Sequence, residues 1–195
     1  KLVSRYDKTK THETQKLSVF KNIMNKKFDV VSCQFAIHYM FENEAKLNTF
    51  CKNVDIVLKQ GGYFIGTCLD GRKVANILDS KEDGKKMGQF NENTLWMLEK
   101  KYDGVFTPNK TGQTISVYIE SINQILDEYL VDLEYLQTKL AQYNIRVLSE
   151  KDLKSLDIKA SIGNFELAYN INEFPLPNVM KQYSFLNTWF VFKKY

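Results

Sequence analysis

The segment from Phe28 to Cys68 constrains the fold more than any other part of the sequence. It begins with an almost unbroken apolar run, Phe28-Asp-Val-Val-Ser-Cys-Gln-Phe35, which is typical of a strand buried on both faces. Residues 42–60 follow with the period of an amphipathic helix, and Gly61-Gly62 offers the left-handed position at which such a helix ends. Tyr63–Cys68 is a second apolar run. The pattern predicts a βαβ unit with parallel strands.

The rest of the chain continues the α/β pattern. The expected elements are a helix from Asp70 or Gly71 to Leu78, a strand over 114–119, a helix capped by Asp132, a strand over 144–148, a short helix over 149–156 and a closing strand over 187–193. Residues 79–113 are charged and irregular, which indicates an insertion with at most one strand. We see no second domain, so residues 1–195 are interpreted as one α/β unit.

Length and composition indicate a globular protein. The 195 residues are 44% hydrophobic and 26% charged, and no apolar run approaches the ~20 residues that span a bilayer. We therefore expect no membrane partner. The net charge of +4, with 24 Lys among 27 basic residues, permits a polyanionic partner without requiring one.

Cysteine and histidine are sparse. Cys33, Cys51 and Cys68 lie far apart in apolar segments, so we expect buried free thiols in a reducing compartment. His12 and His38 are the only histidines, so we expect no metal site.

Ligands of open α/β sheets bind at the carboxyl ends of the strands. The first strand ends in Gln34-Phe-Ala-Ile-His-Tyr39, and the second runs into Gly66-Thr-Cys-Leu-Asp-Gly71. An amide, two aromatic rings and an imidazole suit a planar, hydrogen-bonding ligand such as a nucleobase. The residues alone leave an alternative open, in which Phe35 and Tyr39 are core aromatics and His38 is a structural turn residue.

These motifs resemble a known family. Ser32-Cys-Gln-Phe-Ala-Ile-His-Tyr39, a helix, and then Gly61-Gly-Tyr-Phe-Ile-Gly-Thr67 are similar to the mRNA cap (guanine-N7) methyltransferases. The likeness continues at Glu128-Tyr-Leu-Val131 and in the closing strand, Phe190-Val-Phe192. Leu69-Asp-Gly71 is more similar to the viral members, in which this domain ends a capping polypeptide.

The resemblance implies a fold and a set of site residues. The fold would be the Rossmann-like class I methyltransferase fold, with a central, mostly parallel sheet and an antiparallel last strand. Gln34 and Tyr39 fall where the family contacts S-adenosylmethionine, and Phe35, His38 and Tyr39 fall on the pocket for the cap guanine. Glu128 falls on the carboxylate that recognises guanine; without the motif it would be interpreted as a surface carboxylate.

The chain also departs from the family pattern. The family usually has a Tyr in its last strand, and that position here is Asn187, with Tyr183 and Phe185 as the nearest aromatics; Tyr183 is our candidate for the pocket. The Gly-rich cofactor turn and the acidic residue of the preceding strands are missing, because only 27 residues precede Phe28. We therefore expect the C-terminal part of a catalytic domain, in which Asp7 could flank the adenine.

The resemblance implies methyl transfer from S-adenosylmethionine to guanine N7 of capped mRNA 5′ ends. His38, Tyr39 and Glu128 would position the base, with no acid–base residue. One alternative is a non-catalytic, methyltransferase-like RNA-binding or stimulatory subunit of a capping complex; another is methylation of a small molecule or protein by the same fold. The expected partners are capped RNA and the rest of a capping polypeptide or a stimulatory subunit. The expected location is cytoplasmic, in a viral factory or virion for a viral protein, or nuclear for a cellular one.

Overall fold

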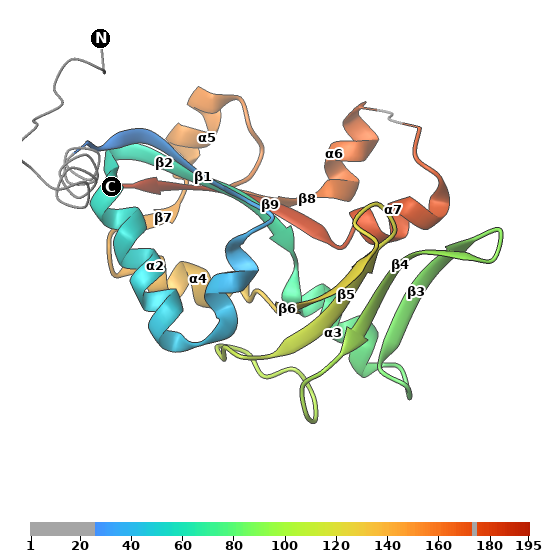
Figure 1. Ribbon diagram of the computed structural model, residues 1–195. Coiled ribbons are helices and arrows are strands. Elements are labelled where there is room, and N and C mark those ends of the chain that lie inside the picture. The colour runs from blue at the N-terminus through green and yellow to red at the C-terminus, as the bar shows by residue number, and fades with distance from the viewer. Residues whose placement is uncertain (1–25, 173–174) are drawn as a thin grey trace, which may run out of the picture.

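The computed structural model describes residues 26–172 and 175–195, which form two sheets with helices packed around them (Figure 1). In chain order the elements are β1 (Phe28–Gln34), η1 (Ile37–Glu42), α2 (Glu44–Val57), β2 (Leu58–Leu69), α3 (Gly71–Asp79), β3 (Lys85–Phe90), β4 (Asn93–Lys100), β5 (Thr114–Ile119), β6 (Gln124–Tyr129), α4 (Leu133–Ala141), β7 (Ile145–Val147), α5 (Glu150–Leu156), β8 (Ile162–Asn164), α6 (Phe165–Asn172), α7 (Asn178–Ser184) and β9 (Asn187–Lys194). No helix in this part of the chain is long and apolar enough to cross a membrane.

The first sheet has the strand order β1-β2-β9-β7, and β8 also pairs with β9. The parallel pairing of β1 with β2 confirms the predicted βαβ unit. The last strand, β9, is antiparallel to β2, β7 and β8, because it starts beside the carboxyl end of β2, with Asn187 opposite Leu69, and runs back along it. Within the described residues β1–β2 is the one parallel pair, so this part of the sheet is mixed and not mostly parallel.

Helices α2 and α4 cover one face of this sheet, and α5 lies on the other (Figure 1). The fully buried core between the sheet and the helices α2 and α4 includes Leu47, Cys51, Phe64, Leu136, Leu140, Phe190 and Phe192. Helix α2 ends at Val57 and not near Gln60, because Leu58 is fully buried and already pairs with Phe28. The three cysteines are free; Cys51 and Cys68 are buried as expected, whereas Cys33 is partly exposed.

The second sheet is antiparallel throughout, in the order β3-β4-β5-β6. Residues 79–113 are therefore more regular than expected, since they contain both strands of the β3–β4 hairpin. The sequence of β3, Lys85-Lys-Met-Gly-Gln-Phe90, lacks an apolar pattern because most of the strand is solvent-accessible. Helix α3 packs on β3 and β4 through Val74, Ala75 and Leu78, which contribute to a second core with Trp96, Leu98, Ile115 and Val117.

Backbone hydrogen bonds join the two sheets where β2 runs into α3. Asp70 N donates to Leu186 O at 2.9 Å, and Gly71 N donates to Val131 O at 2.9 Å. The buried carboxylate of Asp132 caps α4 and accepts from Arg72 of α3, with Nε to Oδ1 at 3.1 Å. This junction holds the carboxyl ends of β1 and β2 against β6 and α7.

Gly66 of β2 allows the close approach of β9. A Cβ atom added at this position would lie 2.3 Å from Cζ of Phe190 and 2.5 Å from Cys33 O. We therefore expect Gly66→Ala to lower the free energy of unfolding by about 1–3 kcal/mol through overpacking. Urea denaturation measures this change.

Gly104→Ala is the control variant. Nothing lies within 4 Å of its added methyl group, so its stability change reports only the backbone strain of a side chain at a φ of +65°. Adding Phe190→Leu to Gly66→Ala should restore part of the lost stability, since it removes the nearest ring atom. Wild-type stability of Gly66→Ala alone would contradict the packing argument.

Candidate functional site

A cavity of about 550 Å³ lies where the carboxyl ends of β1 and β2 face β6 and the α6–α7 region. Its described lining residues are Phe35, His38, Tyr39, Cys68, Leu69, Ile119, Ile122, Leu126, Glu128, Phe165, Leu176, Met180, Tyr183, Ser184 and Asn187. The volume is in the range of small-molecule sites. The cavity therefore lies at the strand ends at which the sequence predicts a ligand.

The turn after β1 brings the first three side chains to the cavity. Phe35 has a φ of +50°, which is uncommon for a bulky residue, and its N–H donates to Thr67 O at 2.9 Å. Ile37 and Phe41 of η1 are fully buried and anchor the short helix. Phe35 and Tyr39 keep 54% and 51% exposure, so their rings have faces free for contact.

His38 is buried at the wall of the cavity, and its Nε2 atom has no hydrogen-bond partner. Its Nδ1 atom lies 3.5 Å from Oε2 of Glu128, and its ring centroid is 4.1 Å from that of Tyr39. Burial lowers the pKa of His38 to about 4, so at neutral pH the imidazole is neutral and the contact with Glu128 is not an ion pair. A buried polar atom without a partner is available to a ligand.

Glu128 reaches the cavity because side chains alternate along β6. The neighbouring Asp127 accepts a hydrogen bond from Ser116 Oγ at 2.6 Å, whereas Glu128 faces His38. No Lys or Arg in the described parts of the chain forms an ion pair with Glu128, and burial raises its pKa to about 7. A carboxyl group in such surroundings is a candidate functional group, since perturbed pKa values cluster at binding and catalytic sites.

Helix α7 closes the cavity opposite η1. Trp96 Nε1 donates to Val179 O at 2.7 Å, which ties α7 to β4, and the Trp96 ring lies 5.6 Å from that of Tyr183. Burial and the charge of Glu128 raise the pKa of Tyr183. The phenol is therefore protonated at neutral pH and lies near the carboxylate.

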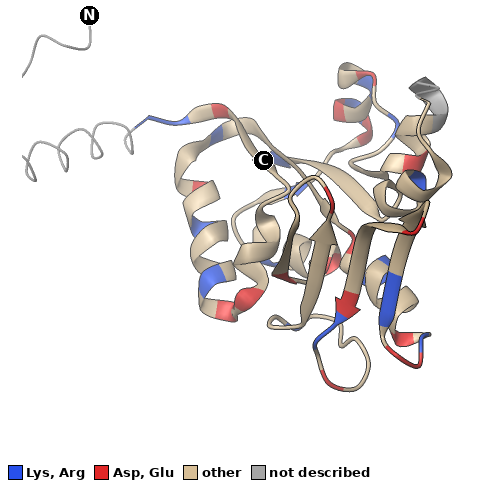
Figure 2. Cartoon of the chain, turned by 45° about the vertical axis from the view of Figure 1, so that its right-hand side comes forward, with Lys and Arg blue, Asp and Glu red and all other residues tan. Residues whose placement is uncertain are grey.

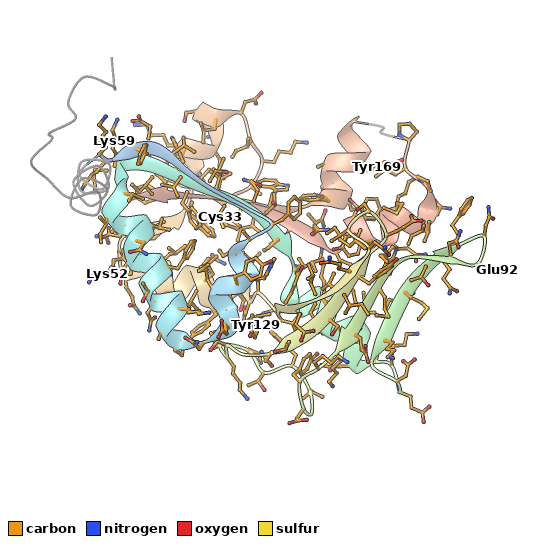
Figure 3. The ribbon with its side chains drawn as sticks, viewed as in Figure 1. Cys33, Lys52, Lys59, Glu92, Tyr129 and Tyr169 are labelled. Carbon is orange, nitrogen blue, oxygen red and sulfur yellow. The ribbon has the colours of Figure 1, made fainter. Side chains whose placement is uncertain are left out.

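Helix α6 packs beside α7. Its Tyr169, labelled in Figure 3, has its ring 5.6 Å from that of Phe185, and Lys181 Nζ lies 4.6 Å from the Tyr169 ring centroid. Phe165, at the start of α6, meets Phe35 edge-on with ring centroids 6.1 Å apart. The two helices thus add an aromatic and apolar wall that the sequence analysis did not anticipate.

Within the described parts of the chain, no group of three or more His, Cys, Asp or Glu side chains could hold a metal ion.

Comparison with known proteins agrees with the motifs. Residues 7–166 match the mRNA (guanine-N(7))-methyltransferase domain. The chain belongs to this family. It is 30% identical over 156 residues to the probable mRNA-capping enzyme of Acanthamoeba polyphaga mimivirus. This alignment covers 77% of this chain and 13% of the mimivirus protein. It is also 30% identical over 145 residues to the mRNA cap guanine-N(7) methyltransferase of Candida albicans. This alignment covers 70% of this chain and 30% of the Candida protein. The chain thus spans less than a third of either relative.

Among solved structures, the CcbJ methyltransferase from Streptomyces caelestis aligns with 88% of this chain and 62% of its own, at 14% identity and a TM-score of 0.48.

The four residues that the family resemblance assigns to the guanine pocket and our further candidate, Tyr183, line one cavity: Phe35, His38, Tyr39, Glu128 and Tyr183. The position usually held by a Tyr is Asn187, and this side chain is buried. Its Nδ2 atom donates to Tyr183 O and Ser184 O, both at 3.2 Å, at the end of α7. Asn187 therefore holds the α7 end from which Tyr183 enters the cavity, while Phe185 packs elsewhere.

The residues assigned to the cofactor are not part of this cavity lining, apart from Tyr39. Gln34 lies at the end of β1, where its Nε2 donates to Ser32 Oγ at 2.9 Å and its Oε1 accepts from Thr67 Oγ1 at 2.8 Å. Asp7 lies outside the described residues. The roles of these residues remain predictions.

Sequence reasoning missed the walls formed by Phe165, Leu176, Met180 and Ser184. No local pattern marks them. Phe165, Met180 and Ser184 belong to short helices, Leu176 lies between these helices, and nothing in their composition points to a ligand. Cys68 and Leu69 are different, since they belong to the strand end that the sequence analysis singled out.

Burial of the Glu128 carboxylate should cost stability at high pH. Its folded-state pKa of about 7 lies above the ordinary value of 4.5, so the folded state loses stability as the pH rises through 7. We expect Glu128→Gln to increase the free energy of unfolding at pH 8, by about 3 kcal/mol at most. Below pH 4.5 the carboxyl is protonated in both states, and the difference should vanish. Chemical denaturation at pH 4 and pH 8 measures this.

Asp127→Asn, on the same strand, is the matched control and should show no such gain, because its carboxylate is bonded to Ser116 on the other face of the sheet. A Glu128→Gln protein that is no more stable than the wild type at pH 8 would argue against a buried, unpaired carboxylate.

Proposed function

We propose that this protein methylates N7 of the guanine cap at the 5′ end of mRNA, with S-adenosylmethionine as the methyl donor. The observation that carries the proposal is the single carboxylate of Glu128 in an aromatic cavity, beside the unpartnered Nε2 of His38. Because the chain belongs to the cap methyltransferase family, we interpret this cavity as a site for the guanine cap.

Glu128 would recognise the base. A carboxylate can accept two hydrogen bonds side by side, and guanine offers N1–H and its exocyclic amine as adjacent donors. Adenine, cytosine and uracil do not present that pair of donors together. The half-exposed rings of Phe35 and Tyr39 offer stacking faces, and Nε2 of His38 is available to a polar atom of the base.

The chemistry would need no general base. Guanine N7 carries a lone pair and no proton to lose, so the work of the protein is to orient the base and to exclude water. When bound, S-adenosylmethionine would supply the methyl group from its sulfonium sulfur and leave as S-adenosylhomocysteine. His38 is neutral, with a pKa of about 4, and acts with Tyr39 as a positioning residue. The Glu128 carboxylate would favour the positive charge that develops on the ring.

The cofactor would lie beside the guanine at the carboxyl end of β1. Gln34 and Tyr39 are both exposed there, which supports their assignment to this side of S-adenosylmethionine. The described residues fit only this one side, and we derive no role for the remainder of the cofactor site.

A second function has an observation in its favour. Gln34 keeps its side-chain amide bonded to Ser32 and Thr67, and it does not line the cavity. A domain that binds caps without turnover, as an RNA-binding or stimulatory subunit of a capping complex, would show these features. The mimivirus relative is a probable capping enzyme of which this chain spans 13%, and we propose that the chain works as part of such a larger polypeptide.

The test is the transfer of labelled methyl groups from S-adenosylmethionine to GpppA-capped RNA. We expect Glu128→Gln to reduce kcat/KM by about 10- to 100-fold, because a charge-assisted pair of hydrogen bonds is weakened. Asp127→Asn should stay within about twofold of the wild type, since its carboxylate does not face the cavity.

Calorimetric titration with the cap analogue and, separately, with the cofactor distinguishes the two functions. Cap binding without cofactor binding or turnover would favour the non-catalytic function. Undiminished turnover by Glu128→Gln would exclude the proposed role of Glu128.

A further inference from the structure

The charge of the cavity is one-sided. Of its fifteen described lining residues, Glu128 is the only acid and none is Lys or Arg. Three other titratable groups that face it are neutral at pH 7: the imidazole of His38, the thiol of Cys68 and the phenol of Tyr183. Basic residues are distributed over the surface instead, interspersed with acidic ones (Figure 2).

The cavity walls also favour a cation. The rings of Phe35, Tyr39, Phe165 and Tyr183 all line it. Aromatic faces attract cations, most strongly where water is excluded, and cages of such rings are a common way to bind methylated cations. A carboxylate surrounded by aromatic rings combines both attractions.

Methylation at N7 converts guanine from a neutral ring into a cation. It also makes N1–H more acidic and hence a stronger donor to a carboxylate. The positive charge is partial in the transition state and complete in the product. When Glu128 is ionised, a negative charge that lowers the barrier must therefore stabilise the methylated product still more, unless a basic group opposes it, and the described lining contains none.

We propose that this cavity binds the N7-methylated cap more tightly than the unmethylated cap, so that release of the methylated RNA limits turnover and methylated caps inhibit the protein. The proposal rests on the proposed function and concerns the regulation of the same site. Neither the family match nor the relatives' names contain this preference.

The experiment compares two cap analogues, GpppA and m7GpppA, binding to the whole chain without cofactor. Trp96 contacts Tyr183 in the cavity wall, so tryptophan fluorescence can report binding, with calorimetry as the second measurement. We expect the dissociation constant for m7GpppA to be at least about tenfold lower. In turnover assays, m7GpppA should inhibit competitively, with an inhibition constant below the KM for GpppA.

Glu128→Gln tests whether the charge is responsible. It keeps the size of the side chain and removes the negative charge, so the preference for m7GpppA should fall to the few-fold contribution of the aromatic rings. Asp127→Asn, whose carboxylate bonds to Ser116, should keep the full preference. Because Glu128→Gln is expected to be the more stable protein at pH 8, loss of folding would not explain a lost preference.

The outcomes separate this inference from the proposed function. Equal affinities, or tighter binding of GpppA, overturn the inference and leave cap methylation intact. A preference that survives in Glu128→Gln overturns the role of the carboxylate charge. Failure of both analogues to bind overturns the inference together with cap recognition itself.

Discussion

Strand β2 is hydrogen-bonded along both edges, and the arrangement around the cavity depends on this double pairing. On one side it runs parallel to β1, which places Thr67 beside the turn at Phe35. On the other it pairs with β9, which brings Asn187 opposite Leu69 and so holds the end of α7. Gly66 permits the approach because no side-chain atom separates Cys33 from Phe190. One strand thus positions two walls of the site, the turn at Phe35 and the end of α7.

The partial burial of the Glu128 carboxylate lowers the stability of the folded protein at neutral and high pH, and the proposed function explains this cost. Glu128 is half-buried beside neutral groups, and its pKa is raised to about 7 by burial. A carboxylate without a cationic partner is unfavourable in an empty cavity and becomes favourable when a ligand supplies hydrogen-bond donors or positive charge. Nε2 of His38 is likewise buried without a hydrogen-bond partner, and a ligand that bonds to it would remove this cost. Both groups can gain a partner when a ligand binds.

Local sequence signals predicted the elements that begin with a helix cap or consist of an apolar run. The apolar run of β1 predicted a strand buried on both faces, but most of β1 is exposed because it lies at the edge of the described sheet. The apolar runs of β1 and β2 and the caps at Asp70 and Asp132 were found because these signals lie within a few residues. The β3–β4 hairpin and β6 were not found. The residues of β3 and β6 are largely exposed and show no apolar pattern, whereas β4 is partly buried and contributes Trp96 and Leu98 to the second core.

The family, the βαβ unit and the places of Phe35, His38, Tyr39 and Glu128 in the pocket could be predicted from the sequence, because these depend on short motifs. The packing of the elements was needed to show that Tyr183 and not Phe185 enters the cavity and that Asn187 holds α7. It was also needed to show that Glu128 faces His38, with no Lys or Arg among the described lining residues. These features depend on strands and helices that meet after long intervals of sequence. The surroundings of a side chain, and therefore its pKa and its free hydrogen-bonding atoms, exist only once those elements have packed.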